Sequence, residues 1–436
     1  MVGRAAVAMA AVLGLSQAPL PAAPLPEPLA LADALALADG DHPDLGLARA
    51  ERLAAEAARA EAGSRSATRL TLEGRLGAVQ PSNRSREAGS LDDGLGLGLR
   101  RQLYDSGRSE ALESAAELEV QGREWAYLER RQARRLEIME RFFDVLTADL
   151  EFVRDNEAMS IAFVRLERAR DRNQLGQLSD VELLAQESAY QQARRRRRTS
   201  EARQRATRSR LAIALGRPGE LPSELVTPPA PPMDRPRPDL EALRRRVLAD
   251  SPRLRALRAR LGAARRALVA ARAFGRPRID AEAGVSWYSR TTGRSYPAEA
   301  RLLLEVPLLT GGERDAGIAA AQARLDQRRA ELAEAELELR QRVLDLWLES
   351  DTLRVSLEAL ETEDAFRELS LDRSRALYEL EVNADLGDAM VQTSRVRLEK
   401  ARVQFRWLLV QAELDALQGR LLPVAAPEGA TGGTEP

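Results

Sequence analysis

The sequence predicts an α+β membrane protein made of two internal repeats, each with a β-hairpin and a long antiparallel α-helical coiled coil. Three observations predict it. The 436 residues are 31 % charged and only 4 % aromatic, a balance typical of long packed helices rather than of one globular core. The order of helices and strands recurs after about 205 residues. An apolar N-terminal run indicates export.

The first segment, residues 1–24, has the order of a signal peptide. Arg4 precedes an apolar run at residues 5–15, and small residues and prolines follow. The run is too short to span a bilayer, and cleavage after Ala18 would leave Pro19 beside the cut. Beyond residue 28 no window reaches the ~20 apolar residues of a membrane-spanning helix. Any insertion into a membrane would therefore use β-strands.

The first repeat is predicted over residues 25–216. Short helices precede an alternating apolar and polar pattern that indicates a hairpin at residues 68–103. A turn then leads into a proline-free helical pattern, which predicts a long helix at 108–172 and a return helix at 179–216. The proline-rich segment 217–238 reads as a linker.

The second repeat is predicted over residues 239–420 and follows the same order. It contains a hairpin at 278–308, a long helix at 313–378 and a return helix at 385–420. The tail, residues 421–436, is predicted to be disordered. Each long helix of about 65 residues would extend roughly 98 Å and must pack against neighbouring helices in water.

Four strands per chain are too few to close a transmembrane barrel, so several chains must share one. Three chains would supply twelve strands. Alternation assigns one set of residues to lipid and another to a wet lumen, and it places Trp287, Tyr288 and Tyr296 near the membrane interface. The lipid set is Leu70, Leu95, Leu97, Val285, Trp287 and Leu302; the lumen set is Arg75, Asp280, Glu282, Glu299 and Arg301.

Several motifs resemble the TolC-like outer-membrane factors over nearly the whole mature chain. Residues 101–108, RQLYDSGR, are similar to the strand-to-helix signature QPLFDGGR, and residues 306–313 keep its proline and both glycines. The segment at 141–146 is similar to the family's aromatic helix motif, and residues 172–179 to its distal turn. The strand-to-helix turns are Asp105, Ser106, Gly107, Pro307, Gly311 and Gly312; glycine suits a sharp swing from strand to helix.

The resemblance implies a homotrimer with a twelve-stranded barrel in the outer membrane and a long periplasmic α-barrel. It also implies helix tips that meet a periplasmic adaptor (membrane fusion) protein joined to an inner-membrane pump. The expected adaptor contact is the tip Leu175, Gly176, Gln177, Leu178 and Ser179, although a simple turn between helices also explains these residues. The expected periplasmic aperture is Tyr378, Asp385 and Asp388, although either aspartate could instead be a helix N-cap.

The remaining sequence features do not indicate an enzyme. The chain has no cysteine and a single histidine, His42, so no cofactor, metal site or catalytic residue is predicted. The run 194–198 is five arginines, which a helix spreads over all its faces, and the net charge is −1; no nucleic-acid partner is expected. The predicted function is a passive export duct for a tripartite efflux pump or type I secretion. The alternative is a periplasmic coiled-coil scaffold or adaptor without a membrane barrel.

Overall fold

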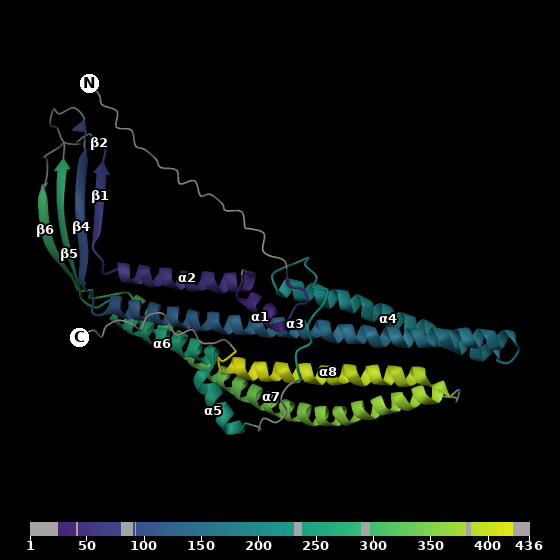
Figure 1. The fold of residues 1–436 in the computed structure, drawn as a ribbon. Coiled ribbons are helices and arrows are strands. Elements are labelled where there is room, and N and C mark those ends of the chain that lie inside the picture. The colour runs from purple at the N-terminus through teal and green to yellow at the C-terminus, as the bar shows by residue number, and fades with distance from the viewer. Residues whose placement is uncertain are drawn as a thin grey trace, which may run out of the picture.

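A computed structural model describes residues 25–40, 42–79, 90–91, 93–230, 238–288, 297–380 and 385–421. The predicted signal peptide, residues 422–436 of the predicted tail and Tyr296 lie outside this part. Figure 1 shows an elongated molecule, with a small sheet at one end and long helices that extend away from it. The fold is mostly helical with a small antiparallel sheet, as the sequence predicted.

Two helices dominate the molecule, and each has 67 residues. At 1.5 Å per residue, each is about 100 Å long. Shorter helices run beside them: α2 and α6 pack on α3, α4 returns along α3, and α8 returns along α7 and also contacts α3. The helices are α1 (Leu31–Ala36), η1 (Leu37–Asp39), α2 (Pro43–Ser64), α3 (Arg108–Gln174), α4 (Asp180–Ala214), α5 (Leu240–Asp250), α6 (Pro252–Ala273), α7 (Glu313–Glu379) and α8 (Leu386–Leu417).

The four main strands form one antiparallel sheet in the order β1-β4-β5-β6. The central pairing of β4 with β5 joins the two halves of the chain, and its register shifts between Gln102 and Tyr104. A separate short ladder, β2 with β3, continues the first hairpin. The strands are β1 (Arg69–Arg75), β2 (Ala78–Val79), β3 (Ser90–Leu91), β4 (Gly94–Tyr104), β5 (Arg278–Tyr288) and β6 (Ala298–Glu305).

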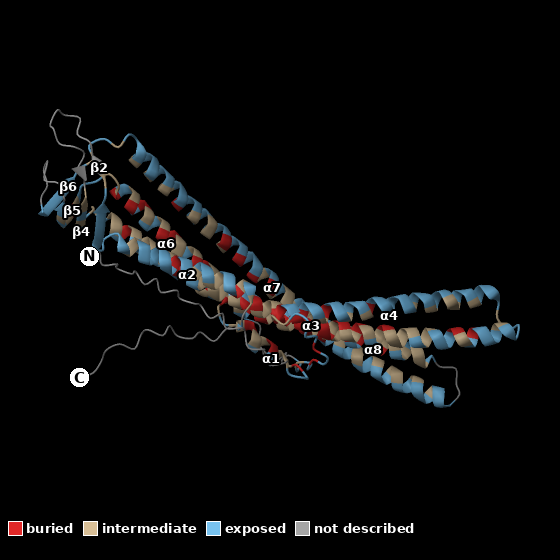
Figure 2. Cartoon of the chain, turned by 90° about the horizontal axis from the view of Figure 1, so that it is seen from above, coloured by how far each residue is buried: buried red, intermediate tan, exposed pale blue. Residues whose placement is uncertain are grey.

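The main core lies midway along the helices, where Figure 2 shows buried residues around α3. Phe142 is fully buried and meets Phe143 edge to face, and the ring of Phe143 stacks on Phe405 of α8 with centroids 4.9 Å apart. The aromatic motif of the sequence therefore joins α3 to α8. Such aromatic pairs contribute about 0.5–1.5 kcal/mol beyond their buried area.

A buried arginine ties the short N-terminal elements to this core. Arg134 of α3 is 3 % exposed, and it donates to the carbonyl of Ala38 at 3.1 Å and to that of Ala214 at 2.6 Å. Burial lowers the pKa of Arg134. The two carbonyls lie at η1 and at the end of α4, where helix termini leave acceptors unsatisfied. One side chain thus fixes three elements together.

Among the described residues, no helix is both long enough and apolar enough to cross a membrane.

Candidate functional site

The sheet has one apolar face and one polar face. Residues paired across strands share a face, so the registers place Leu72, Leu97 and Val285 in one row and Arg100, Glu282 and Arg301 in another on the opposite side. The two sets that the alternation assigned to lipid and to lumen lie on these opposite faces. The apolar side chains are exposed, and Leu302 and Trp287 retain 71 % and 64 % of their surface.

The polar face carries a network of ion pairs between strands. Arg100 of β4 lies 3.2 Å from Asp280 and 3.4 Å from Glu282 of β5. Glu282 also pairs with Arg301 of β6 at 2.7 Å. Asp280 is 6 % exposed, and the ion pair with Arg100 compensates for its burial. The face is therefore suited to water and to dissolved ions rather than to lipid.

The predicted interface aromatics separate in the structure. Trp287 lies on the apolar face opposite Leu95. Tyr288 is the next residue of the strand and points to the other side, where its ring covers Gly94. Successive strand residues face opposite ways, so only Trp287 of these two stands on the apolar face. Tyr296 is outside the described residues.

The first strand-to-helix turn is fixed by backbone geometry and short polar contacts. Gly107 has φ +81° and Ser106 has φ +59°, both in the left-handed region that L side chains rarely adopt. The Asp105 carboxylate accepts from the backbone N–H of Ser109 at 2.7 Å, and the Ser106 hydroxyl donates to the carbonyl of Pro277 at 2.9 Å. The start of α3 is thereby capped and joined to the start of β5.

The second turn uses two glycines in the same way. Gly311 and Gly312 have φ +58° and +84°, and a Cβ at either position would meet no atom within 4 Å. The requirement for glycine is therefore conformational rather than steric. Leu308 and Leu309, which follow Pro307, are 93 % and 92 % exposed. These two leucines are not among the predicted site residues, although adjacent leucines in a turn are an available signal.

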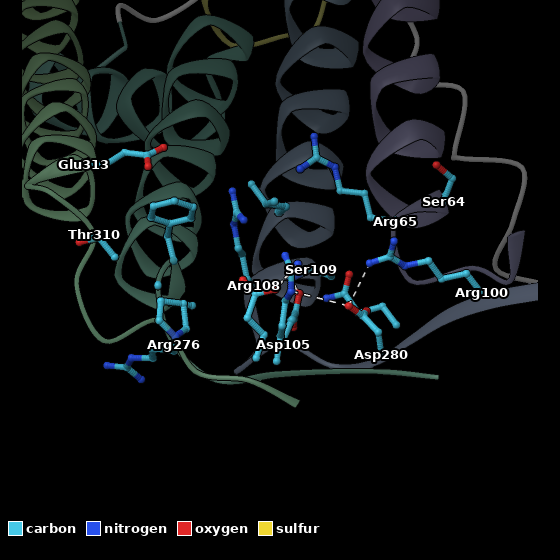
Figure 3. Close-up of a pocket in the computed structure, with 18 of the residues that line it drawn as sticks. Ser64, Arg65, Arg100, Asp105, Arg108, Ser109, Arg276, Asp280, Thr310 and Glu313 are labelled. Atoms are coloured by element: carbon cyan, nitrogen blue, oxygen red, sulfur yellow. Dashed lines mark hydrogen bonds and ion pairs between the residues drawn. The ribbon is translucent and has the colours of Figure 1, made fainter. Parts of the chain in front are cut away.

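A cavity of about 800 Å³ lies between the sheet base and the helix ends (Figure 3). Some of its charged side chains pair: Arg100 lies 3.2 Å from Asp280, and Arg278 lies 2.6 Å from Glu305. The guanidinium of Arg108 stacks over the ring of Phe274 at 4.8 Å. Two of these contacts lie within the sheet and the third joins α3 to the end of α6, so the cavity has polar walls from both the sheet and the helices.

The predicted adaptor tip forms a tight turn between α3 and α4. Gly176 has φ +71°, which ends α3 in the left-handed manner common at helix C-termini. Ser179 begins α4 with a capping box, in which its hydroxyl accepts from the N–H of Glu182 and the Glu182 carboxylate accepts from the N–H of Ser179. The backbone N–H of Ser179, and second its hydroxyl, donate to the Glu182 carboxylate and lower the pKa of Glu182.

The tip also exposes apolar side chains. Leu175, Val181 and Leu184 are 71 %, 78 % and 63 % exposed. Leu175 is among the predicted tip residues, whereas Val181 and Leu184 are not. Beside them a groove of about 330 Å³ between α3 and α4 carries Arg168 and Arg172. The tip therefore presents exposed apolar side chains next to a groove that contains arginines.

The predicted aperture residues lie where α7 ends and α8 begins. Tyr378 is 54 % exposed in the last turn of α7. Asp385 is the N-cap of α8, and its carboxylate accepts from the backbone N–H of Asp388 at 3.0 Å. It also pairs with Arg165 of α3. Arg165 is the larger cause, and the Asp388 N–H the second, of a lowered pKa at Asp385.

The start of α8 packs closely on α3 at the same place. A Cβ at Gly387 would lie 2.7 Å from Cγ2 of Ile161. Gly387 therefore allows a close approach of the two helices, and the ion pair between Asp385 and Arg165 stabilises this contact. Asp385 was predicted to lie near an aperture, but its partner could not be predicted because Arg165 lies 220 positions earlier.

Within the described residues, no group of three or more His, Cys, Asp or Glu side chains could hold a metal. His42 begins α2: its Nδ1 accepts from the backbone N–H of Asp44 at 3.3 Å. Burial is the largest cause of its lowered pKa. This histidine has a structural role at a helix start, where an acceptor satisfies a free N–H group.

Solved structures with this architecture include several outer-membrane channels, so this chain has the fold of those channels. The CmeC outer membrane channel of Campylobacter jejuni superposes with a TM-score of 0.77 at 14 % identity, over 89 % of this chain and 85 % of that one. VceC of Vibrio cholerae gives 0.72 at 16 % identity, over 89 % and 95 %. The open MtrE channel of Neisseria gonorrhoeae gives 0.68 at 18 % identity, over 89 % and 88 %.

A match to a known protein family covers most of the second half of the chain. Residues 243–420 match the family described as outer membrane efflux protein. With the fold, this match confirms the resemblance to TolC-like outer-membrane factors, and with it the location in the outer membrane with a large periplasmic helical part. It is a family of channels rather than of enzymes. No characterised protein matches the chain by sequence.

Proposed function

We propose that the chain is one subunit of a passive export duct that leads from the periplasm to the exterior. Three copies share one barrel of twelve strands, and their helices form a periplasmic tube. The sheet is the observation that carries this proposal, because it has an exposed apolar face, a polar face with ion pairs, and an edge strand on each side whose outer backbone groups have no partner strand. Unpaired backbone groups are not tolerated in lipid, so a sheet of this kind needs neighbours.

The helices support the same assembly. Large apolar side chains of α7 point away from this chain's own core, among them Val355, Phe366 and Leu369, which are 57 %, 59 % and 73 % exposed. Apolar surface of this extent on a helix is normally covered by a partner. In the proposed trimer, the helices of neighbouring copies cover it.

The tip of α3 and α4 is proposed to contact a periplasmic adaptor protein that is linked to an inner-membrane pump. The exposed Leu175, Val181 and the neighbouring Arg168 support this assignment. The proposal covers both tripartite efflux and type I secretion, which require the same duct. A photo-crosslinker at Gln177 should capture the adaptor, and the pump that copurifies with it identifies the class of export system.

The beginning of α8 is proposed to border the periplasmic aperture. There Asp385, Asp388 and Tyr378 of three copies would form a ring. A ring of carboxylates favours cations over anions, so the duct should be cation-selective when this end limits conduction.

The test is the behaviour of the purified mature protein in detergent and in planar bilayers. We expect a trimeric mass and steady single-channel conductance with a preference for cations. The competing candidate, a periplasmic scaffold or adaptor, would fractionate as a water-soluble protein and would not conduct. A folded monomer in plain buffer would overturn the proposed duct.

A further inference from the structure

The two edges of the sheet are complementary in direction. Adjacent strands are antiparallel throughout the order β1-β4-β5-β6, so β1 and β6 run in opposite directions. Every residue of both edge strands is exposed. The β6 strand of one copy can therefore pair antiparallel with the β1 strand of the next, which extends the sheet without a change of pattern.

The edges are also complementary in charge. On the polar face, β1 presents Arg69, Glu73 and Arg75, and within the described residues no ion pair involves any of the three. The polar face of β6 presents Glu299, Arg301 and Glu305. Along β1 these charges run positive, negative, positive. Along β6, read in the reverse direction, they run negative, positive, negative.

We propose that neighbouring copies join in one register, in which Arg69, Glu73 and Arg75 of one copy lie opposite Glu305, Arg301 and Glu299 of the next. This inference rests on the shared barrel of the proposed function. All three charged pairs have opposite signs, and opposite charges that face each other across strands are favourable. On the other face the same register sets Leu70 opposite Leu304, and Leu72 opposite Leu302.

The proposed pairs extend rows of charge that already exist within one chain. Arg301 pairs with Glu282 at 2.7 Å, and Glu282 with Arg100 at 3.4 Å. A Glu73 from the next copy continues this row with the correct sign. In the same way, Glu305 pairs with Arg278 at 2.6 Å, and the neighbouring Arg69 would lie on its other side.

Other registers are unfavourable. A shift of one residue sets charges against leucines and turns the apolar set to the wrong face. A shift of two residues in one direction places Glu73 opposite Glu299, and in the other direction it places Arg75 opposite Arg301. Like charges directly opposite each other are destabilising. The charges therefore select a single register.

Barrel geometry selects the same register. A row that begins at Arg69 passes Arg100, Glu282 and Arg301, and in the proposed register it meets β1 of the next copy four residues higher, at Glu73. Over three copies the offset of four residues adds up to twelve, so the shear number of the barrel equals its number of strands. Eight-stranded barrels with that ratio have a tilt of about 36°. Shifts of two residues would give tilts of about 20° or about 47°, outside the usual 35–45°.

Cysteine pairs test the register directly, because the chain has no native cysteine. The variants Leu72→Cys/Leu302→Cys and Thr71→Cys/Leu303→Cys place the thiols opposite each other in the proposed register. Consecutive pairs in a ladder differ in spacing, so at least one should have suitable geometry. After mild oxidation, we expect covalent trimers on denaturing gels.

The matched controls are Leu72→Cys/Ala300→Cys and Leu72→Cys/Leu304→Cys, which are aligned in the two shifted registers. We expect at least tenfold less cross-linking from each. More cross-linking from a control, or none from any pair in a protein of trimeric mass, overturns the register and leaves the duct intact. A protein of monomeric mass in detergent overturns the shared barrel itself.

Charge reversal gives a second measurement that does not depend on disulfide geometry. Arg75→Glu should lower the fraction of trimer that survives mild heating in detergent, because it faces Glu299. The double variant Arg75→Glu/Glu299→Arg should restore that fraction. If Arg75→Glu instead increased it, Arg75 would face Arg301, and the shifted register would hold.

Discussion

Single residues determine how the chain changes direction. Gly107 and Gly312 begin the two long helices at φ +81° and +84°, and the left-handed conformation costs about 1–2 kcal/mol per residue with a side chain. Asp385 has the corresponding role at α8, but through its side chain: it caps the helix and pairs with Arg165. The first role is conformational and independent of pH, whereas the second depends on charge.

We therefore expect acid to release α8 from α3. Arg165 lowers the pKa of Asp385, so the pair stabilises the contact above the ordinary carboxyl pKa of about 3.9 and is lost as pH falls through the lowered value. Spin labels at Arg168→Cys and Met390→Cys should report a longer distance once the pH falls below the lowered pKa of Asp385, which lies under the ordinary value of about 3.9. Arg165→Ala should lengthen the distance already at pH 7 and remove its pH dependence.

At the scale of elements, the contact between α3 and α8 joins the two halves of the helical part. It combines the close approach at Gly387, the stacked rings of Phe143 and Phe405, and the buried Glu151. Glu151 of α3 is paired with Arg203 of α4 at 3.1 Å and also with Arg402 of α8. Three helices thus share one carboxylate.

The close approach predicts a pair of compensating substitutions. Gly387→Ala should destabilise the protein by about 1–3 kcal/mol, because its Cβ overlaps Ile161. Ile161→Ala/Gly387→Ala should recover part of that loss, as measured by the midpoint of denaturant unfolding. Gly317→Ala on α7 is the control: a Cβ there meets no atom within 4 Å, so no loss is expected. If Gly387→Ala cost as much stability in the Ile161→Ala protein as in the unmodified protein, the overlap with Ile161 would not be the cause of the loss.

A single chain leaves two kinds of surface uncovered. Its sheet has two open edges, and α7 exposes large apolar side chains along much of its length. Both features predict neighbours, one through backbone pairing and the other through helix packing.

Assembly should therefore depend on the exposed face of α7. The variant Phe366→Ser/Leu369→Ser should lower the trimer fraction at least severalfold by native mass spectrometry and leave the helix content of the chain unchanged, because these side chains are 59 % and 73 % exposed within one copy. Glu361→Ser, on an exposed polar position of the same helix, should have no effect. Unchanged assembly in the double variant would show that this face is not an interface.

Much of the molecule could be predicted from local pattern. The helical character, the strand alternation and the glycine turns follow from periodicity and backbone preference, which act over a few residues. Alternation also implies that Trp287 and Tyr288 face opposite sides, a consequence that the sequence analysis did not draw. The exposed Val181 and Leu184 were missed because an apolar residue in a helical pattern is more often buried.

Residue order alone predicts the helical and strand segments and the family resemblance, because both follow from local patterns. The tertiary structure decided which distant groups meet: β4 with β5, Arg165 with Asp385, and Ile161 with Gly387. These contacts join positions at least 175 residues apart, where no local rule fixes the pairing. They depend on how long helices and strands pack, and packing is a property of the whole fold.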